Sequence, residues 1–186
     1  RYGELQVQLK PVDLRTSAAF VMETLSITPI GDQVALVNRL PATLPLVWAD
    51  ENRLRQILHN LLENAIKYTE HGHIVLTAEQ RGDMLAISVT DTGNGMEPEV
   101  LERLFQPFFH YDDRGAGSSA GMGLGLSISQ QLVELQGGQL EVQSQRNQGS
   151  CFTFTLPLAT YADESGHHAQ SRESEYTSSS TAYPEL

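Results

Sequence analysis

The chain has 186 residues, of which 40% are hydrophobic, and this is enough apolar material to bury the core of one domain. Its formal net charge of −11 argues against a nucleic-acid partner, because phosphate backbones are bound through clustered lysine and arginine side chains. The single cysteine, Cys151, excludes an internal disulfide and a multi-cysteine metal site, and it favours a reducing, cytoplasmic setting.

No part of the sequence approaches the roughly 18 consecutive apolar residues of a membrane-spanning helix. The first residues also lack the basic-then-apolar pattern of a signal peptide. We therefore expect a soluble globular unit without direct membrane contact.

The first 70 residues predict two strands and two helices. Residues 5–9 alternate apolar and polar side chains like an edge strand, and residues 34–37 favour a second strand. Asp13 is placed to cap a helix that runs through Leu25. Asp50 caps the clearest helix of the chain, whose apolar residues follow helical spacing: Leu54, Ile57, Leu58, Leu61, Leu62, Ala65 and Ile66.

Two antiparallel hairpins are predicted farther along the chain. Residues 73–79 and 84–90 alternate in polarity around the turn Arg81-Gly82-Asp83, which places Asp91 at the end of a strand. Residues 139–145 and 150–157 alternate in the same way.

The segment between these hairpins predicts two helices and a loop. Residues 97–104 form the first helix, with Pro98 in its first turn. Residues 106–120 have no apolar period and contain several glycines and serines, which indicates a mobile loop. The second helix runs from about Gly123 to Gln136 and ends at two glycines.

This order of elements predicts a two-layer α+β fold, in which one mixed and mostly antiparallel sheet is covered on one face by helices. A doubly wound parallel sheet is not expected, because the strands pair as hairpins. From Asp163 onward the composition changes to Ser, Thr, Glu and His, so we expect residues 161–186 to be a disordered tail or linker.

Asn60 and Asn64 interrupt the apolar stretch of the clearest helix. They are four residues apart, so both amides leave the same helix face. A buried amide needs partners, and an amide oxygen is a hard ligand that suits Mg²⁺. Lys67, three residues after Asn64, is placed to reach a phosphate, although alone it would be a surface lysine.

Asp91 begins the segment Asp91-Thr92-Gly93-Asn94-Gly95. A carboxylate accepts hydrogen bonds, so it can recognise the exocyclic amine of adenine, whereas guanine presents a carbonyl at that position. Gly93 and Gly95 would let the backbone approach the base. In isolation the pattern is weak, because aspartate and glycine are ordinary turn residues.

A glycine-rich segment, residues 121–125, leads directly into the last predicted helix. Such a segment directs backbone N–H groups and the positive end of a helix dipole at anions, although it could equally be a flexible hinge. It is not a Walker loop, because no Lys-Ser or Lys-Thr follows it. In an acidic protein, a bound polyphosphate would have to be neutralised locally by a divalent metal, helix N-termini and a few placed cations.

Taken together, these segments resemble the ATP-binding catalytic domain of sensor histidine kinases, in the superfamily shared with gyrase, Hsp90 and the mismatch-repair ATPases. The resemblance runs from about Pro11 to Leu158 and implies a Bergerat-type ATP-binding fold. It rests on segments that look like the N box (54–69), the G1 box (91–96), the F box (105–109), the G2 box (121–126) and the closing hairpin (149–157).

The resemblance implies ATP and Mg²⁺ as ligands and gives individual residues roles. Asn64 would coordinate Mg²⁺, and Asn60 and Lys67 would contact phosphates. Asp91 would bind the adenine amine, with Tyr68 packed beside the base. Residues 106–122 would form a lid over ATP. The remaining ATP-binding residues that it implies are Gly93, Gly95, Met96, Phe105, Gly121, Met122, Gly123, Leu124, Gly125, Leu126 and Thr153, the last supporting Asp91 through water.

One position bears on the reaction type. Hydrolytic members of the superfamily resemble one another in carrying a glutamate four residues before the metal-binding asparagine, where this chain has Asn60. Glu63 is turned by about 100° around the helix from Asn64, so it cannot easily take the place of that glutamate. Transfer of the γ-phosphate to a histidine is therefore favoured. The alternatives are a catalytically degenerate regulatory module that binds another kinase, and an ATPase of the gyrase or Hsp90 type.

The phosphate-accepting histidine is expected in a separate domain. None of the six histidines of the chain has the His-Glu or His-Asp context of the family's phosphoacceptor box. We therefore interpret residues 1–10 as the exit from a dimerisation hairpin and residues 11–160 as the catalytic domain. The implied partners are this chain's own dimerisation helices in a homodimer and a response regulator receiver domain. The family's usual parent is anchored in the inner membrane.

Overall fold

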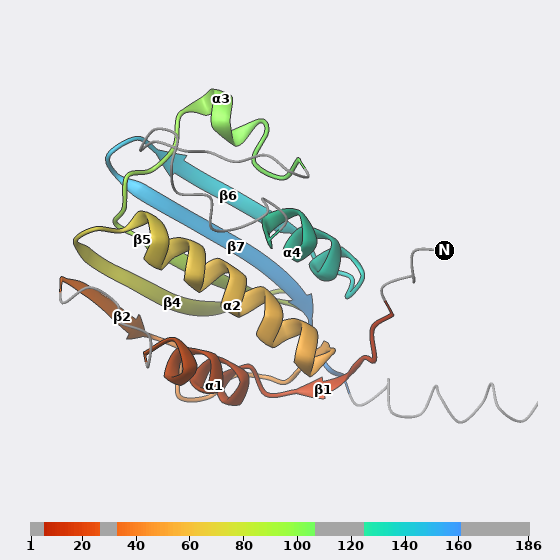
Figure 1. Ribbon diagram of the computed structural model, residues 1–186. Coiled ribbons are helices and arrows are strands. Elements are labelled where there is room, and N and C mark those ends of the chain that lie inside the picture. The colour runs from red at the N-terminus through yellow and green to blue at the C-terminus, as the bar shows by residue number, and fades with distance from the viewer. Residues whose placement is uncertain (1–5, 27–32, 107–124, 161–186) are drawn as a thin grey trace, which may run out of the picture.

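The computed structural model describes residues 6–26, 33–106 and 125–160 of the chain (Figure 1). In chain order, the elements are β1 (Lys10–Val12), α1 (Leu14–Ser26), β2 (Val34–Asn38), β3 (Val47–Ala49), α2 (Glu51–Tyr68), β4 (Gly72–Arg81), β5 (Met84–Asp91), α3 (Pro98–Leu101), α4 (Gly125–Glu134), β6 (Leu140–Gln145) and β7 (Gly149–Pro157).

The main sheet has five strands in the order β2-β4-β5-β7-β6. β2 and β4 are parallel, and the other neighbouring pairs in this sheet are antiparallel. Figure 1 shows α2 lying along the sheet, with α1 and α4 on either side of it. The core lies between these layers, since Leu76, Ile87 and Phe154 from the sheet are fully buried in one cluster with apolar residues of all three helices. The predicted two-layer α+β fold is confirmed.

Helix α2 forms the centre of the helical layer because its sequence is strongly amphipathic. Asp50 caps it, as predicted: Asp50 Oδ1 accepts hydrogen bonds from the backbone N–H groups of Asn52 and Arg53 at 3.0 and 3.1 Å. Five large apolar residues on one face are fully buried, each worth roughly 1.5–3 kcal/mol relative to exposure: Leu54, Ile57, Leu58, Leu61 and Leu62. Within the three described ranges, no helix has the length and apolar run that a bilayer crossing requires.

The two hairpins are also confirmed, and their registers determine what lies beside the end of β5. β4 and β5 turn at Gly82, whose φ of +64° favours glycine. β5 then pairs with β7 in a register that places Asp91 opposite Ser150 and Ser88 opposite Thr153. Asp91 lies at the end of its strand, as expected.

Several element boundaries differ from the prediction. The strand expected over residues 5–9 is wrong: residues 6–9 form no strand, and β1 pairs instead with β3, a strand that the sequence pattern did not indicate. Pro11 is tolerated there because the sheet has only two strands. α3 ends at Leu101 rather than Leu104. α4 ends at Glu134, followed by a turn in which Gly137 has a φ of +79°.

Candidate functional site

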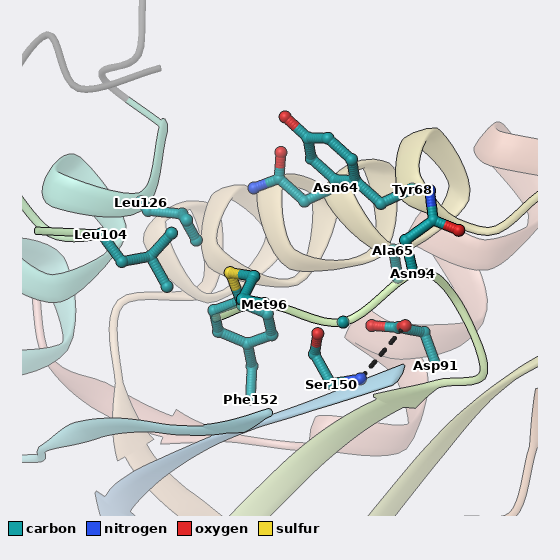
Figure 2. Close-up of a pocket in the computed structure, with 11 residues that line it drawn as sticks. Asn64, Ala65, Tyr68, Asp91, Asn94, Met96, Leu104, Leu126, Ser150 and Phe152 are labelled. Atoms are coloured by element: carbon teal, nitrogen blue, oxygen red, sulfur yellow. Dashed lines mark hydrogen bonds between the residues drawn. The ribbon is translucent and has the colours of Figure 1, made fainter. Parts of the chain in front are cut away.

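A pocket opens where the C-terminal half of α2 faces the ends of β5 and β7 (Figure 2). Figure 2 shows Asn64 and Tyr68 on the α2 side and Asp91 and Ser150 on the sheet side. Most of the remaining lining is apolar. The residues that line the pocket are Asn64, Ala65, Tyr68, Asp91, Asn94, Gly95, Met96, Leu104, Leu126, Ser150 and Phe152.

Asp91 is the one carboxylate among the described residues that line this pocket. It is only 5% exposed, and its Oδ1 accepts hydrogen bonds from the backbone N–H groups of Gly93 at 2.8 Å and Ser150 at 3.2 Å. Burial raises the pKa of Asp91, and these two hydrogen bonds offset only part of that effect. Both bonds reach the same oxygen, which leaves Oδ2 as the acceptor for a ligand's donor group.

The apolar walls define the shape of molecule that this carboxylate could bind. Met96, Leu104 and Phe152 lie on one side of the pocket in Figure 2, and Leu126 reaches in from the start of α4. A planar ring can be buried against such walls, while its donor group meets the buried acceptor. An aromatic heterocycle with an exocyclic amine, such as adenine, fits this combination.

The turn that follows Asp91 is held by backbone contacts within the protein. Asn94 N donates to the Tyr68 carbonyl at 3.2 Å, and Asn147 N donates to the Asn94 carbonyl at 2.6 Å. A Cβ at Gly93 would collide with that same Tyr68 carbonyl, and one at Gly95 would collide with the Gln145 carbonyl. Gly95 also has a φ of +62°. The close approach of neighbouring backbone is therefore one reason for both glycines, and the expectation that they also let the backbone approach a base stays a prediction.

The residues at the C-terminal end of α2 differ in how they relate to the pocket. Asn64 and Tyr68 line it and are partly buried. Lys67 is exposed and is not a lining residue; its ammonium lies 5.3 Å from the centre of the Tyr68 ring. This contact places a cation beside Tyr68, one of the residues that line the pocket. Asn60 lies one turn before Asn64, and its Nδ2 donates to the Gly125 carbonyl at 3.3 Å and to Ser129 Oγ at 3.1 Å.

Not every predicted site residue is brought to the pocket. Thr153 alternates with Phe152 and Phe154, which face the core, so it lies on the opposite face of the sheet. There its hydroxyl is hydrogen-bonded to Ser88 at 2.8 Å. Ser150, and not Thr153, stands beside Asp91. Phe105 packs against the core and does not line the pocket.

Some predicted site residues cannot be placed, and other lining residues were not predicted. Residues 121–124 and most of the segment expected to form a lid lie outside the described residues. The sequence analysis missed Ala65, Asn94, Leu104, Ser150 and Phe152 as lining residues. No local sequence signal points to Ser150, because its place beside Asp91 comes from the register between β5 and β7, which belong to different hairpins.

A metal at this site would need ligands beyond those that the described residues offer. Among the described residues, no group of three or more His, Cys, Asp or Glu side chains could hold a metal ion. Asn64 offers one amide oxygen at the pocket. This single hard ligand fits Mg²⁺, which commonly keeps waters and takes phosphate oxygens as its other ligands.

Similar proteins share both the sequence and the fold. Curated relatives include the adaptive-response sensory kinase SasA of Synechococcus sp. (strain CC9311), which is 39% identical over 149 residues. That match covers 79% of this chain and 39% of the relative, so the chain spans well under half of the relative's length.

Solved structures of other proteins are similar to this chain in both fold and sequence. Full-length ShkA in complex with AMPPNP is similar with a TM-score of 0.72 and 35% identity, covering 84% of this chain and 32% of that one. The nucleotide-free catalytic domain of the histidine kinase ThkA has a TM-score of 0.69 and 27% identity, covering 81% of this chain and 96% of that one.

A family model described as histidine kinase-, DNA gyrase B-, and HSP90-like ATPase matches residues 49–160. This range begins just before α2 and includes every residue that lines the pocket. The chain therefore belongs to the family of histidine kinase-, DNA gyrase B- and HSP90-like ATPases.

Proposed function

We propose that this chain is the ATP-binding catalytic domain of a two-component sensor histidine kinase. It holds ATP with Mg²⁺ and presents the γ-phosphate to a histidine in a separate dimerisation domain. The observation that carries the proposal is the buried Asp91 carboxylate at the base of an otherwise mostly apolar pocket. The similarity to the sensory kinase SasA, and to ShkA, which was solved in complex with AMPPNP, supports it.

Adenine selectivity would come from Asp91. Its Oδ1 is held by the backbone N–H groups of Gly93 and Ser150, and Oδ2 accepts from the exocyclic amine. Guanine would place a carbonyl against the carboxylate, and two acceptors that face each other without a shared proton leave a buried polar group unsatisfied. Ser150 takes the supporting position that the family resemblance assigned to Thr153.

The phosphates would lie toward Asn64 and the start of α4. Asn64 supplies an oxygen for Mg²⁺, and the metal offsets phosphate charge in a protein whose net charge is −11. Lys67 adds a cation beside Tyr68. Gly121 to Leu124 belong to this proposal as phosphate-contacting residues, together with Gly125 and Leu126, which are at the start of α4.

Phosphoryl transfer is favoured over hydrolysis because α2, which is described along its whole length, presents no general base for water beside Asn64. Asn60 occupies the position four residues earlier, and its Nδ2 is bonded to α4. Glu63 is exposed and faces His59 across 3.6 Å. Transfer needs positioning and charge neutralisation more than covalent participation by the protein, so these residues are sufficient for it.

The proposal extends to the parent protein. Residues 1–10 leave a dimerisation hairpin that carries the phosphate-accepting histidine and forms a homodimer. Residues 11–160 form the catalytic domain, and residues 161–186 are a tail or a linker. A response regulator receiver domain takes the phosphate in turn. The parent is anchored in the inner membrane, with this domain in the cytoplasm.

Calorimetric titration of the chain with a non-hydrolysable ATP analogue tests the proposal. The titration is run with Mg²⁺ and with EDTA, and a GTP analogue serves as the matched control ligand. We expect binding that is tighter with Mg²⁺ and selective for adenine. Absence of binding would overturn the proposal and favour the degenerate regulatory module, whereas steady hydrolysis of ATP itself would favour an ATPase.

A further inference from the structure

Helix α4 contacts Asn60 through a serine that the proposed function does not use. Ser129 is fully buried, and its Oγ lies 3.1 Å from Asn60 Nδ2. The second partner of the same nitrogen is the Gly125 carbonyl, at 3.3 Å. Both partners belong to α4, so the side chain of Asn60 joins α2 to the first turns of α4.

These two contacts determine which end of the Asn60 amide is turned toward α4. The Gly125 carbonyl can only accept a hydrogen bond, so the amide must present its NH₂ group to it. The two hydrogens of Nδ2 are then both used, one on the carbonyl and one on Ser129 Oγ. Oδ1 is the atom of the amide that can meet a ligand, and it can act only as an acceptor.

An acceptor suits a metal ion or its water shell and does not suit a phosphate oxygen. Asn60 lies four residues before Asn64, so the two side chains leave the same face of α2. If Asn64 holds Mg²⁺, Asn60 Oδ1 lies one helical turn away, where it could accept from a metal-bound water. A phosphate oxygen at that place would face another acceptor without a proton between them.

We infer that Ser129 is a positioning residue for metal-dependent nucleotide binding: together with the Gly125 carbonyl, it holds the Asn60 amide with its oxygen toward the metal-bearing end of the nucleotide. The inference rests on the proposed function. It gives Asn60 the role of an acceptor on the metal side, in place of the phosphate contact that the family resemblance implied.

Titration of Ser129→Ala with a non-hydrolysable ATP analogue tests this assignment. A buried hydrogen bond contributes about 1 kcal/mol, so we expect affinity with Mg²⁺ to fall about five-fold. With EDTA the loss should shrink toward zero, and adenosine affinity should not change, because adenosine carries no phosphates or metal. Ser129→Cys, with a weaker acceptor, should give an intermediate loss.

Two controls separate positioning from a structural effect. Ser17 on α1 is also fully buried, but its hydroxyl has no hydrogen-bond partner among the described residues, so Ser17→Ala should leave nucleotide affinity unchanged. In an Asn60→Ala background, Ser129→Ala should add no further loss beyond about two-fold, because it acts only through Asn60. Thermal unfolding of every variant reports its folded state.

The outcomes distinguish the two proposals. If the unchanged chain binds no nucleotide, the proposed function fails. If the unchanged chain binds and Asn60→Ala weakens binding equally with Mg²⁺ and with EDTA, Asn60 contacts phosphate and the inference is overturned. Equal losses from Ser129→Ala in the presence and absence of Asn60, or losses that extend to adenosine, would also overturn it.

Discussion

The two ends of helix α2 use their polar groups in different ways. At the N-terminal end, Asp50 accepts from the backbone N–H groups of Gln8, Asn52 and Arg53, and its own N–H donates to Gln136 Oε1 at 2.8 Å. At the C-terminal end, Asn64 and Tyr68 line the pocket. The polar groups at one end therefore hold the fold together, whereas Asn64 and Tyr68 at the other end face the pocket.

Two aspartates show the same contrast in their pKa values. Burial acts to raise the pKa of Asp50, but the backbone hydrogen bonds from Gln8, Arg53 and Asn52, with the nearby Arg53 charge, outweigh it and the pKa is lowered. Burial dominates at Asp91, and its pKa is raised. Hydrogen bonds and a nearby positive charge stabilise the ionised form of Asp50, whereas burial destabilises the ionised form of Asp91 more than its two hydrogen bonds stabilise it.

The largest expected effect comes from removing the ligand-facing charge. Asp91→Asn replaces the carboxylate by an amide. If the amide turns its NH₂ group to the adenine amine, two donors face each other; if it turns its oxygen there, the hydrogen bond loses the charge that strengthens it. Loss of a buried charge-assisted hydrogen bond of about 1.5–3 kcal/mol predicts roughly 10- to 100-fold weaker binding of an ATP analogue, measured by calorimetry. Asp50→Asn is the matched control and should retain adenine selectivity. Equal losses in both variants would contradict the contrast.

A glycine beside the pocket should affect stability more than a glycine at an open turn. Gly93→Ala forces a Cβ against the Tyr68 carbonyl, and we expect about 2–3 kcal/mol lower unfolding free energy, typical of overpacking. Gly82→Ala meets nothing within 4 Å and strains only a φ of +64°, so about 1 kcal/mol is expected. Urea unfolding measures both values. A smaller loss for Gly93→Ala than for Gly82→Ala would show that the turn can move away from α2.

Removing the cap of α2 should lower stability with little effect on selectivity. Asp50→Ala removes the acceptor for three backbone N–H groups, and loss of an N-cap costs about 1–2 kcal/mol. Chemical unfolding measures this loss, and the preference for an ATP analogue over a GTP analogue should persist in the folded fraction. Loss of that preference would show that the two ends of the helix are coupled.

The smallest expected effect is the pH dependence of stability, which compares both aspartates in a single chain. Asp50 has a lowered pKa, so the stability it contributes is present above 3.8 and is lost as the pH falls through its lower folded-state pKa. Asp91 has a raised pKa, so it makes the ligand-free protein more stable as the pH falls through the window between its raised pKa and 3.8.

Lowering the pH should weaken adenosine binding, although it stabilises the ligand-free protein through Asp91. Adenine needs the Asp91 carboxylate, so affinity for adenosine should begin to fall at a pH above the ordinary aspartate value of 3.8. Adenosine is used because it has no phosphates that titrate. The Asp91→Asn variant shows how much of the change in affinity comes from protonation of the ligand and of groups other than Asp91. A fall of equal size in that variant would exclude Asp91 as the titrating group.

Local sequence patterns were sufficient for the elements whose signals lie within a few residues. The apolar spacing of α2 and the cap at Asp50 follow from helical periodicity, and the two hairpins follow from alternation around their turns. Asp91 was predicted at the end of a strand for the same reason. On α2, Asn64 was predicted from its four-residue spacing from Asn60, and Tyr68 was predicted from the family resemblance.

Tertiary structure decided what depends on contacts between distant segments. The pairing of β1 with β3 joins residues about 40 positions apart, and no local pattern encodes it. The register between β5 and β7 places Ser150 beside Asp91 and turns Thr153 to the other face. The packing of α4 on α2 directs the Asn60 amide onto Ser129 and Gly125. Sequence by itself determined candidate residues such as Asp91 and Asn64, because residue type and spacing are local, whereas only the fold decided which candidates line the pocket and which of their atoms are left to face it.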